Sequence, residues 1–298
     1  MNPTPDRSAR TWNHLFFLCA LSAMLGILLL EVIKNYIMKE YRLKGCGCAV
    51  RYLEFPGNEP PIVFLHGLGC ASSFEYPSVA AQPPLSGRRA ILIDLLGAGY
   101  SDRPADFSYT VEDHAAYLNE MLVHLDLNDI ILFGHSLGGA VAICLAGLLQ
   151  GRLRQLILTE SNLDPSAEGA TSRKIGSQTY ENFLSRGYDR MLARAQQKNP
   201  LWSATFAHWL PAAAWRISRS AMRGGTPSWR RQLYDLHIPK SFLFGEHTLP
   251  SADVAALREN GVRVEIIPNA GHSMALENPL ALAKTVASII ADVTENKP

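Results

Sequence analysis

Short apolar segments recur along the chain, and sequence with helical spacing or turn-forming residues separates them. The apolar segments are residues 62–65, 90–93, 130–133, 156–159, 241–245 and 262–267. Unbroken apolar runs of this length are typical of parallel strands that are covered on both faces. Because residues 110–125, which have helical spacing, lie between two of these runs, the pattern predicts βαβ units and a parallel sheet.

The alternation of strands and helices stops between residues 161 and 235. This stretch has helix-forming sequence and four of the chain's five tryptophans, and the strand pattern resumes after it. We therefore expect a sheet domain formed by residues 45–160 and 236–298, with a helical insertion over 161–235. The tryptophans either line an apolar pocket or attach short helices to the core.

The N-terminal part of the chain has a different character. Residues 11–30 contain no Asp, Glu, Lys or Arg, and a helix of that length spans about 30 Å, the thickness of a bilayer core. A cleaved signal peptide and a buried helix are the alternatives, but the apolar stretch exceeds the ~7–15 residues of a secretory core and no small-x-small cleavage site follows it. The sequence predicts that residues 1–44 form a tail and a single-pass membrane anchor, with the span at about 11–33.

Charge and composition limit the partners. The formal net charge is +1, and the chain is 47% hydrophobic and 18% charged, so it is globular and has no feature that favours nucleic acid. More Lys and Arg residues follow the apolar span than precede it. This excess favours a cytoplasmic position for the main body of the protein.

The segment 130–133 is followed by Gly134-His135-Ser136-Leu137-Gly138 and then by a small-residue helix pattern over 138–149. This order fits the G-x-S-x-G nucleophile elbow, in which a serine occupies a strained turn between strand and helix. Glycines on both sides relieve the crowding, and the helix N-terminus favours developing negative charge. An ordinary strand–turn–helix connection is the alternative. The sequence predicts that Ser136 is a nucleophile.

A serine nucleophile needs a base and donors for the oxyanion. His272 follows the last predicted strand in a glycine-containing loop, so we expect it to be the base. The backbone N–H of Leu137, directly after the nucleophile, is one expected donor. The N–H of Leu68, in the His66-Gly67-Leu68-Gly69 loop, is the other, and His66 itself is expected to form structural hydrogen bonds.

Four motifs then stand in a characteristic order. They are His66-Gly67-Leu68-Gly69, the turn from Asp94 to Asp102, the elbow at Ser136, and Gly271-His272. Over about residues 46–294 the chain resembles the α/β-hydrolase superfamily. The resemblance implies a mostly parallel eight-stranded sheet with a helical cap inserted after the sixth strand, a structural role for Asp94 and Asp102, and no metal or organic cofactor.

The catalytic acid departs from the usual pattern of that superfamily. Many members place an Asp after the seventh strand in a G-x-x-D pattern, but this chain has Gly245-Glu246-His247-Thr248 there. Threonine cannot supply the negative charge that stabilises an imidazolium. In some branches, including the haloalkane-dehalogenase-like branch, the acid follows the sixth strand, which is the position of Glu160 here. We expect Glu160 to be the acid, with Glu246 and Asp164 as alternatives.

Together these features predict a membrane-anchored serine hydrolase that cleaves a carboxylic ester, apolar or lipid-like, through an acyl-enzyme. The resemblance implies that epoxide hydrolase and dehalogenase chemistry would need Asp in place of Ser136. Two alternatives stay open. One is another serine-triad reaction, on a thioester, an amide or a carbon–carbon bond, or acyl transfer. The other is a catalytically silent binding protein.

Overall fold

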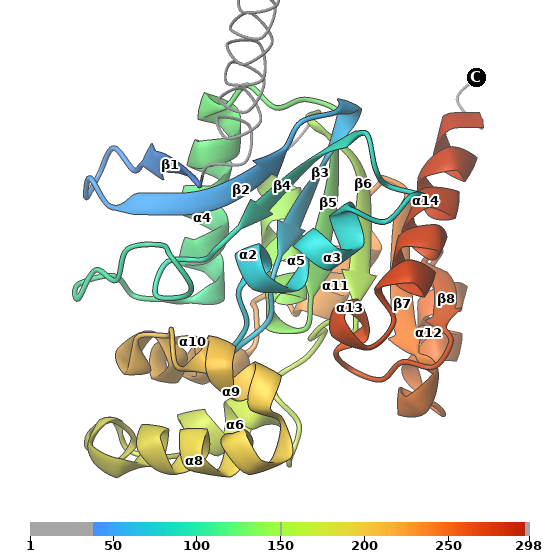
Figure 1. The fold of residues 1–298 in the computed structure, drawn as a ribbon. Helices are drawn as coiled ribbons and strands as arrows, with labels where there is room; N and C mark the ends of the chain where they lie inside the picture. Colours follow the sequence, from blue (N-terminus) through green and yellow to red (C-terminus); the bar gives the residue numbers. More distant parts are fainter. Residues whose placement is uncertain (1–37, 150, 296–298) are drawn as a thin grey trace, which may run out of the picture. The chain divides into compact units, whose positions relative to one another are not determined.

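The computed structural model describes residues 38–149 and 151–295, and these contain an eight-stranded sheet (Figure 1). The strands are β1 (Lys39–Arg42), β2 (Ala49–Phe55), β3 (Asn58–Leu65), β4 (Arg88–Ile93), β5 (Ile130–His135), β6 (Leu153–Thr159), β7 (Lys240–Gly245) and β8 (Arg263–Ile267). Their order is β1-β2-β4-β3-β5-β6-β7-β8, and all pairs from β4 to β8 are parallel. The predicted mostly parallel eight-stranded sheet is confirmed.

Both faces of this sheet are buried, which explains the unbroken apolar runs in the sequence. On β3, Val63 and Leu65 belong to one core cluster, whereas Ile62 and Phe64 belong to another on the opposite face. The first face is covered by α4 (Val111–His124) and α5 (Leu137–Leu148), and the second by α3 (Pro77–Ala80) and α14 (Pro279–Glu295). Burial of each large apolar side chain contributes about 1.5–3 kcal/mol, so both layers stabilise the strands that carry the site.

Strand β1 corrects one predicted boundary. It pairs antiparallel with β2 at the edge of the sheet. Of its four side chains, Tyr41 alone is buried, so the strand has no apolar run for a sequence pattern to detect. The sheet domain therefore starts near Met38 and not at residue 45.

The predicted membrane span at about 11–33 lies outside the described residues. In the part of the chain that the structure describes, no helix is both long and apolar enough to cross a bilayer.

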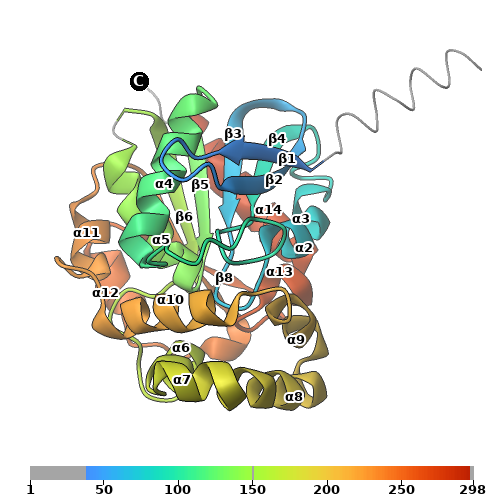
Figure 2. The same cartoon turned by 90° about the vertical axis from the view of Figure 1, so that its left-hand side faces the viewer.

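The predicted helical insertion lies between β6 and β7, and most of it lies beyond the carboxyl ends of the parallel strands (Figures 1 and 2). Its helices are α6 (Thr171–Gly176), α7 (Tyr180–Asn182), η1 (Phe183–Gly187), α8 (Tyr188–Lys198), α9 (Pro200–Phe206), α10 (Pro211–Arg223) and α11 (Trp229–Asp235). Helix α11 packs against α5, where Trp229 is fully buried. The segment from α6 to α10 thus forms the cap, and α11 belongs to the core layer.

The remaining short helices connect the sheet to the loops of the site. They are α2 (Ser72–Glu75), η2 (Glu246–Thr248), α12 (Asp253–Glu259) and α13 (Met274–Glu277). Helices α2 and α13 follow the two loops that carry Leu68 and His272, and η2 follows β7 directly. The carboxyl edge of the sheet is therefore the place where the predicted site residues meet.

Candidate active site

The elbow brings Ser136 to the end of β5 in a conformation that few residues adopt. Its backbone φ is 51° and its ψ is −123°, and α5 begins at the next residue. Neighbouring backbone is packed too closely for larger side chains: a Cβ on Gly138 would lie 2.2 Å from the carbonyl oxygen of His66. The strain and the close packing are typical of a functional turn.

His272 reaches this serine from the loop after β8. Its Nε2 lies 3.1 Å from Ser136 Oγ, a hydrogen-bonding distance. If Nε2 accepts the hydroxyl proton, the ring's own proton must sit on Nδ1, which faces Glu160. The structure thus joins the predicted nucleophile and the predicted base in the geometry that proton transfer requires.

Glu160 lies beside Ser136 because of strand register. His135 pairs with Thr159 across β5 and β6, so the next residue of each strand emerges at the same edge. The Oε2 atom of Glu160 is 4.0 Å from His272 Nδ1, which is longer than a hydrogen bond. Such contacts in ligand-free sites commonly shorten when substrate binds.

Two hydrogen bonds hold the other carboxylate oxygen of Glu160, Oε1, in place. Oε1 accepts hydrogen bonds from the Gly245 N–H at 2.8 Å and from the Thr248 hydroxyl at 2.6 Å. That hydroxyl has one proton and a second acceptor within reach, the Gly245 carbonyl at 2.8 Å; the charge on the carboxylate favours donation to Glu160. The threonine at the position where many family members have the acid therefore holds the carboxylate of Glu160, the predicted acid.

The two alternative acids are engaged elsewhere. Asp164 forms an ion pair with Arg230, at 2.9 Å from its Nε. Glu246 accepts a hydrogen bond from the Asn269 N–H at 2.8 Å. Within the described residues, Glu160 is the one of these three carboxylates that lies within 4.0 Å of His272.

Two residues near His272 were not expected from the sequence. His135 is buried against it, with ring centroids 4.8 Å apart, and burial lowers the pKa of His135 well below its usual value. Glu277 lines the pocket, and its carboxylate accepts a hydrogen bond from the Gly271 N–H. Sequence motifs gave no signal for either role, because His135 occupies an unspecified position of the G-x-S-x-G elbow and Glu277 belongs to none of the motifs.

The pKa of His272 is lowered by desolvation, and the carboxylates of Glu160 and Glu277 act in the opposite direction. Because 55% of the His272 side chain is exposed to the pocket, we expect the net lowering to be small. The ring is therefore neutral near pH 7 and able to accept a proton.

The loop that carries Leu68 is fixed from both sides. On the core side, His66 donates from Nδ1 to the Gly67 carbonyl at 2.9 Å and accepts from the Leu95 N–H at 3.0 Å. These bonds fix the peptide unit that bears the Leu68 N–H. His66 thus forms structural hydrogen bonds, as the sequence predicted.

On the cap side, three consecutive carbonyls of the loop accept side-chain hydrogen bonds. The pairs are Trp202 Nε1 with Leu68 O at 3.0 Å, Thr205 Oγ1 with Gly69 O at 2.7 Å, and Trp209 Nε1 with Cys70 O at 2.8 Å. All three donors come from α9 and the turn that follows it. We call these donors the cap clamp, and its geometry couples the position of the cap to the predicted oxyanion donor.

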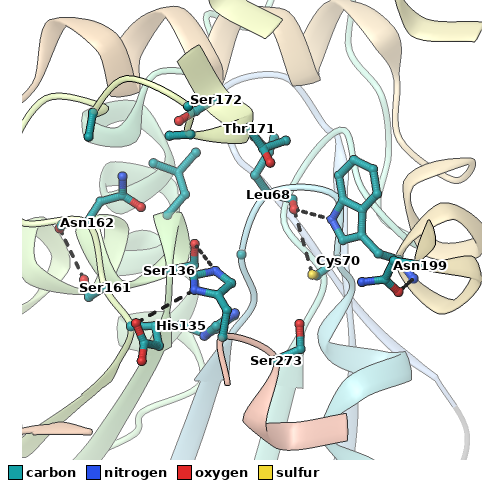
Figure 3. Close-up of a pocket in the computed structure, with 18 of the residues that line it drawn as sticks. Leu68, Cys70, His135, Ser136, Ser161, Asn162, Thr171, Ser172, Asn199 and Ser273 are labelled. Carbon is teal, nitrogen blue, oxygen red and sulfur yellow. Dashed lines mark hydrogen bonds and ion pairs between the residues drawn. The ribbon is translucent and has the colours of Figure 1, made fainter. Parts of the chain in front are cut away.

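A pocket of about 710 Å³ lies between the sheet edge and the cap. Ser136 and His135 form one side of it, and Thr171 and Ser172 lie opposite (Figure 3). Leu68 and Leu137, whose N–H groups are the predicted oxyanion donors, also line it. Many of the other lining residues are small or polar, including Ser161, Asn162, Asn199 and Ser273.

A family model described as alpha/beta hydrolase fold matches residues 60–208, half of the chain. The chain belongs to the α/β-hydrolase family. Among curated relatives, the hydrolase LipZ of Mycobacterium tuberculosis is 25% identical over 272 residues, which cover 80% of this chain and 90% of LipZ. Haloalkane dehalogenase 2 of Mycobacterium bovis is 30% identical over 160 residues, 51% of this chain and 54% of the dehalogenase.

Solved structures show the same α/β-hydrolase fold. The N-acyl homoserine lactonase AidH matches with a TM-score of 0.71 at 20% identity, over 88% of this chain and 100% of the lactonase. An esterase from Exiguobacterium antarcticum matches with a TM-score of 0.70 at 19% identity, over 87% of this chain and 100% of the esterase. At this identity the likeness concerns the fold alone.

Proposed function

We propose that this α/β-hydrolase is a serine hydrolase that cleaves carboxylic esters through an acyl-enzyme. The observation that carries the proposal is the 3.1 Å approach of His272 Nε2 to Ser136 Oγ at the pocket surface. A strained serine in contact with a neutral imidazole is the arrangement that nucleophilic catalysis needs. The serine also argues against dehalogenase and epoxide hydrolase chemistry, for which the superfamily uses Asp at this position.

In the proposed reaction, Ser136 Oγ attacks the ester carbonyl carbon while His272 Nε2 takes the hydroxyl proton. The N–H groups of Leu68 and Leu137 stabilise the oxyanion, and Glu160 stabilises the imidazolium. Collapse of the tetrahedral intermediate breaks the ester C–O bond, and His272 gives its proton to the leaving alcohol. Water then attacks the acyl-enzyme with His272 as base, which releases the carboxylic acid and restores Ser136.

The substrate is proposed to have an apolar part, because Leu68, Leu137 and Trp202 face the pocket. The small and polar residues of the remaining wall give room for polar groups as well. A lipid-like ester that combines both parts fits this lining better than a purely apolar one. Thioesters and amides would use the same machinery, and comparison of their kcat/KM values would rank them.

Membrane attachment is proposed from the uncharged segment 11–30. We infer a single-pass anchor at about 11–33 with the hydrolase domain on the cytoplasmic side. Alkaline carbonate extraction of membranes should leave the full chain in the pellet and release a variant that lacks residues 1–37. Release of both forms alike would contradict the anchor.

The reaction is tested with the full chain in detergent and p-nitrophenyl butyrate as substrate. We expect a burst of p-nitrophenol equal to the enzyme concentration when deacylation is slow, and a loss of kcat on the order of 10⁴-fold in Glu160→Gln. Glu246→Gln is the matched control and should retain activity. Near-normal turnover in Glu160→Gln, together with a strongly reduced kcat in Glu246→Gln, would identify Glu246 as the catalytic acid. Failure of the folded wild type to hydrolyse esters, thioesters or amides would favour the silent binding protein.

A further inference from the structure

A second cavity of about 700 Å³ lies within the cap, beside the catalytic pocket. Residues of α6, α8 and α9 line it. Thr171 and Trp202 line both cavities, so the two spaces are adjacent at these side chains. A ligand that extends from Ser136 past Trp202 would enter this second space.

Four cations line the second cavity: Lys174 on α6 and Arg190, Arg194 and Lys198 on α8. The three on α8 recur at every fourth residue, so they lie along one face of the helix. The lining contains no Asp or Glu. We call this cavity, with its four cations, the basic groove.

These cations lack the carboxylate partners that some other basic residues have. Among residues 38–149 and 151–295, no carboxylate oxygen lies within 4.0 Å of any of the four. By contrast, Arg231 on α11 pairs with Asp235 at 2.8 Å, and Arg263 pairs with Glu265 at 2.7 Å. Like charges at this helical spacing repel one another, so a bound anion would stabilise α8.

We propose that the basic groove binds an anionic group of the substrate whose ester bond is cleaved at Ser136. The inference rests on the proposed function and narrows its substrate class to amphiphilic esters that carry a carboxylate or phosphate group. Guanidinium groups bind such anions in bidentate geometry, which suits Arg190 and Arg194. Trp202 links the two regions, because it lines the groove and donates its N–H to the Leu68 carbonyl.

The test compares two esters, p-nitrophenyl decanoate and mono-p-nitrophenyl sebacate, which differ by a terminal carboxylate. We expect the double variant Arg190→Gln/Arg194→Gln to raise the ratio of the sebacate KM to the decanoate KM about tenfold at low ionic strength. Salt at 0.15 M should reduce this change, because it screens exposed charges. The matched control, Arg258→Gln/Lys284→Gln, removes the same charge from α12 and α14 and should leave the ratio unchanged. An unchanged ratio in the groove variant, or an equal change in the control, overturns the proposal.

A second measurement separates this inference from the proposed function. Binding of both esters to Ser136→Ala, measured by isothermal titration calorimetry, needs no turnover. If the wild type hydrolyses neither ester, the proposed function fails. The difference in calorimetric affinity between the two esters still shows whether the basic groove binds the terminal carboxylate. Binding of inorganic phosphate that depends on Arg190 and Arg194, without any gain for the sebacate ester, would identify a site for a free anion and overturn the assignment to substrate.

Discussion

Replacement of Thr248 by valine tests whether this side chain holds Glu160, the proposed catalytic acid. Valine keeps the shape of threonine and removes the hydroxyl that lies 2.6 Å from Glu160 Oε1. A hydrogen bond to a charged group contributes about 1.5–3 kcal/mol, and about 1.4 kcal/mol corresponds to a tenfold change in rate. Because Glu160 keeps the Gly245 N–H at 2.8 Å, we expect the smaller end of this range. The predicted result is a kcat about tenfold lower with little change in KM.

The assay is steady-state hydrolysis of p-nitrophenyl butyrate by wild type, Thr248→Val and Thr248→Ser. Serine retains the hydroxyl and should recover most of the lost kcat, which a purely structural role of the methyl group would not allow. In a Glu160→Gln background, Thr248→Val should have little further effect, because the two residues act as a unit. A full tenfold effect in that background, or a wild-type kcat in Thr248→Val, would show that Thr248 does not act through Glu160.

Three further outcomes follow from the structure. Thr205→Val should lower kcat several-fold, because it removes the hydrogen bond to Gly69 O at 2.7 Å that helps to hold the oxyanion loop, and Thr205→Ser should restore it. The pH profile of kcat/KM should fall on the acid side with an apparent pKa below 6.5, since desolvation lowers the pKa of His272; a value above 7 would contradict this assignment. Burial lowers the pKa of His114 to about 3, so the unfolded chain binds the extra proton between about pH 6.5 and 3, and stability should fall as pH drops through that window. Between neutral pH and pH 5, the free energy of unfolding should fall by about 2 kcal/mol. Denaturant unfolding of His114→Phe at several pH values should show a weaker dependence of this free energy on pH, smaller by up to one proton.

The meeting of Ser136, Glu160 and His272 was predictable because it depends on strand ends. Strand β5 ends immediately before Ser136, β6 ends immediately before Glu160, and β8 ends a few residues before His272. Parallel strands present their carboxyl ends at one edge of a sheet, so residues that follow them meet there. Local pattern and sheet topology were sufficient for this part of the site.

The contacts that hold these residues were not predictable in the same way. Thr248 and Glu160 are 88 residues apart, and Trp202 and Leu68 are 134 apart. No periodicity connects such positions, since each contact depends on how the cap and the loops pack. Strand β1 escaped prediction for a different reason, because an exposed edge strand needs no apolar run.

Covalent labelling with a fluorophosphonate shows whether Ser136 is an activated nucleophile, as proposed above. Intact-mass and peptide mass spectrometry of the full chain should show one adduct per molecule, located on Ser136 and lost in Ser136→Ala. Labelling should also be much slower in His272→Ala, because the serine would lack its base. Absence of an adduct in folded wild-type protein, or an adduct on another residue that survives Ser136→Ala, would exclude Ser136 as the nucleophile.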